Sequence, residues 1–72
     1  MRLSEKIYRC RKKAGMSQEE LAARLGVSRQ AVSKWENGTS DPSTSNLCAL
    51  AKLYGIPVEE LLHEMQEEKS ED

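Results

Sequence analysis

The chain has no phenylalanine, and tryptophan and tyrosine together make up only 4% of its 72 residues. No apolar run approaches the roughly 20 residues that a membrane-spanning helix needs, and no apolar stretch follows the N-terminus as it would in a signal peptide. So short a chain closes one small core, so we expect a single domain of modest stability that self-association would support. These absences predict a cytoplasmic protein with no membrane segment.

Residues that build metal sites and enzyme active sites are scarce. Cys10 and Cys48 stand alone without a Cys-x-x-Cys spacing, and His63 is the single histidine, so the sequence predicts no metal, no cofactor and no disulfide framework. We expect both cysteines to be buried, reduced thiols. The sequence contains no nucleophile–base pair or phosphate-binding loop, which argues against an enzyme.

Charge is unevenly distributed along the chain, although the net charge is only −1. Residues 1–38 contain nine Lys and Arg against four Glu, a net charge of +5. Residues 39–72 contain two Lys against eight acids, a net charge of −6. This polarity predicts one face suited to a polyanion and another that a polyanion avoids.

Apolar residues recur at helical spacing in five short segments, which predicts an all-α fold. Ser17 and Glu20 have the spacing of a capping box, which places the start of the second helix at Gln18. Ser28 is the expected N-cap of the third helix, and residues 39–46 form the expected loop after it. The predicted inward positions are, in chain order, Leu3, Ile7, Cys10 and Ala14; Leu21, Ala22 and Leu25; Ala31, Val32 and Trp35; Leu47, Leu50, Ala51 and Tyr54; and Val58, Leu61, Leu62 and Met65.

The second and third segments have the elements of a helix-turn-helix. Ala22 is small where the two helices would cross, and Gly26 permits a turn that a Cβ would strain. Val32 and Trp35 would hold the third helix against the core, so we interpret Trp35 as a core anchor rather than a base-stacking platform. The other side chains of this helix are polar and long, with more hydrogen-bonding capacity than a solvated face requires.

The segment GMSQEELAARLGVSRQAVSKWENG, followed by PSTSNLCALAKLYGIPVEELL, resembles the phage-repressor helix-turn-helix family of Cro/CI or XRE type over residues 3–65. The resemblance implies a compact five-helix bundle with a lambda-repressor-like DNA-binding domain over residues 1–65. Its helix-turn-helix unit would span about residues 17–37, and an acidic, flexible tail would follow over residues 66–72. The family implies a homodimeric transcription regulator, most often a repressor, acting on double-stranded DNA at a palindromic operator.

The resemblance also implies roles for individual residues. It places base contacts on the third helix, at Ser28, Arg29, Gln30, Ser33 and Lys34. Phosphate contacts are expected from the second helix and the loop after the third, at Gln18, Asn37 and Thr39. Backbone amides of that loop are expected to contribute as well. Lys12, at the end of the first helix, is a further candidate for a phosphate contact by its charge rather than by the resemblance. Arg11 and Glu36 occupy positions that form a structural salt bridge in some members.

Two alternatives remain open from the sequence. Leu62 and Met65 either complete the core or form an exposed apolar patch that favours dimerisation. The acidic fifth helix also suits a different function, that of an antitoxin-like or regulator-binding module whose protein partner is unknown. Steep salt dependence of binding to duplex DNA would argue against that second function.

Overall fold

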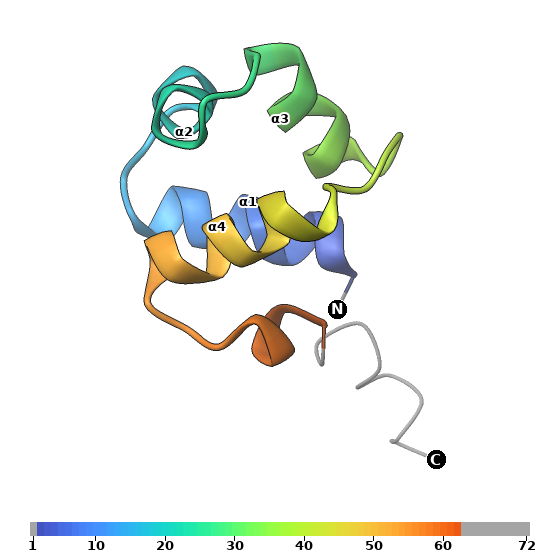
Figure 1. Ribbon diagram of the computed structural model, residues 1–72. Helices are drawn as coiled ribbons and strands as arrows, with labels where there is room; N and C mark the ends of the chain where they lie inside the picture. Colours follow the sequence, from blue (N-terminus) through green and yellow to red (C-terminus); the bar gives the residue numbers. More distant parts are fainter. Residues whose placement is uncertain (1, 63–72) are drawn as a thin grey trace.

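The computed structural model describes residues 2–62, and every regular element within that range is helical. Four helices are followed by a further helical segment, residues 58–62, which reaches the last described residue. This confirms the predicted all-α, five-helix fold. Figure 1 shows α2 and α3 on one side of the molecule and α1 and α4 on the other. The four helices are α1 (Leu3–Lys13), α2 (Gln18–Leu25), α3 (Arg29–Asn37) and α4 (Thr44–Tyr54).

Serine side chains cap the starts of α2, α3 and α4. Ser17 Oγ accepts a hydrogen bond from the Glu20 amide at 3.0 Å, and the Glu20 carboxylate accepts one from the Ser17 amide at 3.1 Å. The predicted capping box therefore begins α2. Ser28 Oγ accepts from the Ala31 amide at 3.1 Å and begins α3 in the same manner. Local hydrogen bonds therefore determine the residues at which α2 and α3 begin, and both of these N-termini lie near the predicted DNA-binding face.

The fourth helix begins inside the run that its composition predicted to be a loop, at the cap position, Ser43 or Thr44, that the family resemblance implied for it. The expected loop over residues 39–46 ends at residue 43, because α4 already begins at Thr44. Ser43 Oγ accepts from the Asn46 amide at 3.2 Å, and this cap satisfies an amide of the first helical turn before the first apolar residue of the helix is reached.

The prediction that both cysteines are buried is wrong. Cys10 is only partly buried, and Cys48 is exposed. Successive residues of a helix turn by about 100°, so Cys48, which directly follows the partly buried Leu47, points to solvent beside the buried stripe of α4. Ala14 is exposed as well, since it lies in the turn after α1 rather than on the helix.

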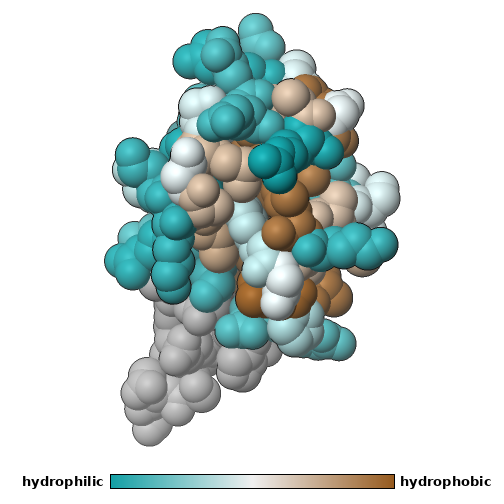
Figure 2. All heavy atoms as spheres, turned by 90° about the vertical axis from the view of Figure 1, so that its left-hand side faces the viewer, coloured by the Kyte–Doolittle hydropathy of each residue, from teal (hydrophilic) through white to brown (hydrophobic). Residues whose placement is uncertain are grey.

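The core draws side chains from all five helical segments. Val32 is fully buried and Trp35 is 5% exposed, and α3 packs against both α1 and α2. Partly buried apolar side chains surround this centre, and on one face they reach the surface in a band bordered by hydrophilic side chains (Figure 2). The buried apolar residues are Leu3, Ile7, Leu21, Ala22, Val32, Trp35, Leu50, Ala51 and Leu61. None of the helices in residues 2–62 has the length and apolar character needed to span a bilayer.

The turn between α2 and α3 depends on glycine for its backbone conformation. Gly26 has φ +72°, and a Cβ built there meets no heavy atom within 4 Å. The requirement is therefore conformational rather than a matter of space, because residues with a Cβ rarely adopt positive φ. After Gly26 the Val27 amide donates to the Ala22 carbonyl oxygen at 3.0 Å, which closes α2 and sets the direction in which α3 begins.

Candidate nucleic-acid interface

The outer side of α3 presents the long polar side chains predicted to read bases. Arg29, Gln30 and Lys34 are exposed, whereas Val32 and Trp35 on the same helix are buried. Because one side of α3 is anchored in the core, the opposite side is held in a defined orientation toward solvent. The three longest predicted base-contacting side chains therefore belong to one rigid surface.

The two serines predicted to contact bases are placed differently. Ser28 Oγ accepts the N-capping hydrogen bond of α3. Its hydroxyl can still donate its proton to a base. Ser33 is partly buried beside the exposed Lys34. Both serines lie close to the helix surface, and neither extends from it as the longer side chains do.

The positive charges of α3 are not neutralised within the described part of the chain. Neither Arg29 nor Lys34 takes part in an ion pair among residues 2–62, and the first turn of α3 contains no acid. The one acid of this helix, Glu36, is engaged elsewhere. The outer side of α3 thus carries cations available to a polyanion.

The salt bridge expected between Arg11 and Glu36 is present and nearly buried. Arg11 Nε lies 2.7 Å from Glu36 Oε2, and Arg11 Nη2 donates to Glu36 Oε1 at 3.1 Å. The two side chains are 10% and 5% exposed. Arg11 Nη1 also donates to the Met16 carbonyl oxygen at 2.8 Å, so the guanidinium joins α1, the following turn and α3. The hydrogen bond to Glu36 raises the pKa of Arg11 above its ordinary value.

Gln18 belongs to the same network, which the sequence did not predict. Its Nε2 donates to Glu36 Oε1 at 3.0 Å, so the side chain expected to contact a phosphate is held by a carboxylate of α3. The backbone amides of Gln18 and Glu19 are in the first turn of α2, where helix geometry provides no intrahelical partner. Those amides and the second N–H of Gln18 are the donors that remain for a phosphate.

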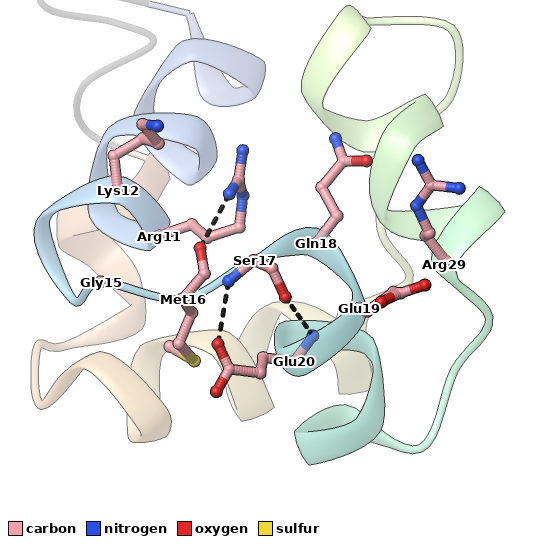
Figure 3. A pocket seen from close by; sticks show the side chains of 9 residues that line it. All are labelled: Arg11, Lys12, Gly15, Met16, Ser17, Gln18, Glu19, Glu20 and Arg29. Atoms are coloured by element: carbon pink, nitrogen blue, oxygen red, sulfur yellow. Dashed lines mark hydrogen bonds between the residues drawn. The ribbon is translucent and has the colours of Figure 1, made fainter.

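The ends of α1, α2 and α3 border one open concavity of about 750 Å³ (Figure 3). Lys12 reaches it from α1, Gln18 and Glu19 from α2, and Arg29 from α3. Two residues predicted to contact phosphates are therefore next to a residue predicted to contact a base. This arrangement brings together residues that are up to 17 positions apart in the sequence.

The loop after α3 uses its backbone amides internally. The amides of Gly38, Thr39 and Ser40 all donate to the Lys34 carbonyl oxygen. In this structure these amides close the C-terminus of α3, and their contact with phosphates stays a prediction. Asn37 Oδ1 accepts from both the amide and the hydroxyl of Thr39, which leaves the Asn37 side-chain NH2 as one donor available at this loop.

Tyr8 is a further candidate that the sequence reasoning missed. It is 44% exposed on α1, with Arg11 Cζ 5.3 Å and Lys12 Nζ 6.0 Å from the ring centroid. A cation over an aromatic ring is attracted to its face, so Tyr8 restrains Lys12 at the border of the concavity. The i, i+4 spacing of Tyr8 and Lys12 was the signal available in the sequence.

The two dimer candidates are only partly described. Leu62 is 38% exposed and follows the fully buried Leu61. Met65, His63 and the predicted tail lie outside the described residues. Among residues 2–62 no group of three or more His, Cys, Asp or Glu side chains is placed to hold a metal ion.

The hydroxyl of Tyr54 is buried and has no hydrogen-bond partner within the described residues. Burial raises the pKa of Tyr54 above its ordinary value of 10.0. The unfolded chain loses this proton near pH 10 while the folded chain keeps it, so stability is full below pH 10 and falls as pH rises above it. We expect Tyr54→Phe to leave stability at pH 7 unchanged or slightly higher and to reduce the loss above pH 10.

Urea denaturation of both proteins at pH 7 and at pH 10.5 measures this difference. Tyr8→Phe is the matched control, since Tyr8 is exposed. A destabilisation of Tyr54→Phe at pH 7 by more than about 1 kcal/mol, the net contribution of a typical hydrogen bond, would show that the Tyr54 hydroxyl is satisfied in solution.

The comparisons with known proteins agree with this geometry. The crystal structure of the P22 c2 repressor in complex with a synthetic operator matches with a TM-score of 0.80 and 34% identity, covering 85% of this chain and 92% of that one. Fold and surface therefore define a helix-turn-helix protein of phage-repressor type. The sequence model of the Helix-turn-helix family matches residues 7–61, and the chain belongs to this family.

Two curated relatives show the range of the family. The transcriptional activator BcrR of Enterococcus faecalis is 39% identical over 62 residues, which are 86% of this chain and 30% of BcrR. The cryptic phage CTXphi transcriptional repressor RstR of Vibrio cholerae is 35% identical over 63 residues, 88% of this chain and 57% of RstR. The chain thus spans between about a third and just over half of the length of these relatives.

Proposed function

We propose that this protein binds double-stranded DNA in a sequence-specific manner through α3 and regulates transcription. The observation that carries the proposal is the outer side of α3, where Arg29, Gln30 and Lys34 are exposed and the two cations are unpaired among residues 2–62. The P22 c2 repressor, whose fold this chain shares, is bound to a synthetic operator in its crystal structure. That likeness supports placing α3 in the major groove.

The side chains of α3 have the chemistry of base readout. Arginine bonds bidentately to guanine and glutamine to adenine, and each such pair contributes about 1–3 kcal/mol of discrimination. Lys12, the Gln18 side chain and the Asn37 NH2 group would contact phosphates on either side, which positions the protein without selecting a sequence. Ser28 and Ser33 add short polar contacts close to the helix. Thr39, whose amide donates to Asn37 Oδ1, would contact a phosphate beside Asn37.

The regulatory mechanism we propose is repression by occupancy of an operator. RstR and the P22 c2 protein are described as repressors and BcrR as an activator, so the family supports both outcomes. Homodimerisation through the exposed Leu62, with Met65 as the second dimer residue predicted from the sequence, would place two copies of α3 about 34 Å apart, one helical turn of DNA. A palindromic operator is the corresponding DNA symmetry.

Selection from a random duplex library at about 0.1 M salt, where exposed charges are already substantially screened, tests this proposal. Arg29→Ala is selected in parallel, with Arg24→Ala as the control, because Arg24 is also an exposed arginine but lies at the end of α2. We expect the wild-type chain to recover a palindrome. Arg29→Ala should relax one base pair in each half-site by about 1–3 kcal/mol, and Arg24→Ala should retain the full consensus.

Each part of the proposal has its own contrary outcome. Recovery of a single half-site without symmetry would contradict the dimer and leave base readout intact. Equal relaxation by Arg24→Ala and Arg29→Ala would contradict the role of α3. If no sequence were enriched, binding of a protein partner at the surface around Leu62 would become the better hypothesis for the function of this protein.

A further inference from the structure

One acid at the proposed DNA surface, Glu19, has no side-chain hydrogen-bond or ion-pair partner among residues 2–62, unlike the acids near it. Glu20 is occupied by the Ser17 cap, and Glu36 by Arg11 and Gln18. Glu19 is exposed and, among residues 2–62, accepts no side-chain hydrogen bond and joins no ion pair. As an acid in the first turn of α2, Glu19 interacts favourably with the helix dipole. At a surface that meets phosphates, the same negative charge also weakens binding.

The geometry places Glu19 beside Arg29. Both line the concavity between α1, α2 and α3. Figure 3 shows the Glu19 carboxylate on the side of α2 that faces the start of the Arg29 side chain, with the Arg29 guanidinium extending away from it. Glu19 is the second residue of α2 and Arg29 is the first residue of α3. Both helix starts are capped by serines and α2 packs directly on α3, so the spacing between the two backbones is rigid.

A carboxylate at this place has two effects on the guanidinium. It attracts Arg29 and so limits the directions that a long, exposed side chain can take. It also repels phosphate oxygens from the space around Arg29. A contact between Arg29 and a phosphate, which would compete with the contact to a base and would not depend on sequence, is thereby disfavoured. Excluding a competing contact is a recognised route to specificity, because discrimination is a difference between two binding energies.

We propose that Glu19 is a specificity-determining residue, which positions the Arg29 guanidinium for a base edge and excludes it from the phosphates. This inference rests on the proposed DNA-binding function and adds to it a second residue that sets specificity from outside α3. Glu19 contacts no base itself. It lowers affinity for all DNA and raises the preference for the operator over other duplexes.

The test compares Glu19→Gln with the wild-type protein on three duplexes at one salt concentration: the selected operator, the operator with the Arg29-dependent base pair changed, and a random sequence. Glu19 and Arg29, both among the described residues, do not form an ion pair, so an exposed ion pair, which contributes about 0.2–1 kcal/mol or a factor of up to about five, sets the upper limit of the effect. We therefore expect Glu19→Gln to bind the random duplex more tightly by a factor of up to about five. Discrimination at the Arg29-dependent base pair should fall by about the same factor.

Glu5→Gln is the matched control, since Glu5 is likewise an exposed acid in the first turn of a helix but does not line the concavity. It should leave discrimination unchanged. In an Arg29→Ala background, Glu19→Gln should also have no effect on discrimination, because the residue on which Glu19 acts is absent. Far-UV circular dichroism of every variant establishes that the helices are retained.

Three outcomes would overturn the inference. If Glu19→Gln tightened binding to all three duplexes by one common factor, Glu19 would act by general repulsion only. If discrimination changed equally with and without Arg29, Glu19 would not act through it. If the wild-type protein bound all three duplexes equally, the proposed function itself would fail, and the inference with it.

Discussion

Replacing Trp35 with alanine is expected to destabilise the domain by about 3–5 kcal/mol, the range measured for large aromatic-to-alanine changes in protein cores. Trp35 is 5% exposed and anchors α3 together with the fully buried Val32. In a chain of 72 residues a loss of this size is comparable with the whole free energy of unfolding. We therefore expect the variant to be largely unfolded at 37 °C.

Urea and thermal denaturation followed by far-UV circular dichroism measure this loss. Intrinsic fluorescence does not serve, because Trp35 is the single tryptophan of the chain. Tyr8→Ala is the control, since Tyr8 is 44% exposed and should lose about 1 kcal/mol or less with its cation contacts. Comparable losses in the two variants would contradict the assignment of Trp35 to the core.

The second large effect is expected at the ion pair between α1 and α3. Glu36→Ala should destabilise the protein by about 3–5 kcal/mol, because it leaves the Arg11 guanidinium, whose side chain is 10% exposed, without its carboxylate. The same change releases Gln18, which donates to Glu36. Alanine at this one position thus removes the hydrogen bonds that link Arg11 of α1 and Gln18 of α2 to α3, while the apolar packing of the three helices remains.

A double variant separates the contribution of the ion pair to the free energy of unfolding from the cost of leaving the buried Arg11 guanidinium without a carboxylate. Arg11→Met with Glu36→Leu fills the same space with apolar side chains and should be markedly more stable than Glu36→Ala alone. Glu59→Ala, at an exposed position, is the control and should change stability by less than about 0.5 kcal/mol. If the double variant were the less stable of the two, the pair would contribute more than the desolvation it costs.

Much of the fold was accessible from the sequence because its determinants are local. The capping box of Ser17 and Glu20 and the N-cap at Ser28 are made within three residues of the chain, and each was predicted from spacing alone. The left-handed turn at Gly26 is likewise a property of one residue. Cys48 was wrongly predicted to be buried because a shift of one position along a helix changes burial. The loop before α4 was predicted too long because the Ser43 cap starts the helix before its first apolar residue.

The candidate site was accessible in its residue types but not in its connections. The sequence predicted which side chains α3 presents, and the family resemblance predicted the pairing of Arg11 with Glu36. It predicted neither that Gln18 donates to that same carboxylate nor that Thr39 engages Asn37. From the sequence, an exposed polar side chain could bond to any of several polar groups. The packing of the helices decides which of them lies within hydrogen-bond distance.

The sequence by itself determined where the helices lie and which face of each is apolar, because capping, backbone conformation and 3.6-residue periodicity act over one or two turns. Only the tertiary structure decided which charges meet. The contacts of Glu36 with Arg11 and Gln18 span 25 and 18 positions, and the neighbourhood of Glu19 and Arg29 depends on the angle between α2 and α3. Such contacts are decided by how the buried faces fit together, since the strength of a charge interaction depends on distances of a few ångströms that no local pattern specifies.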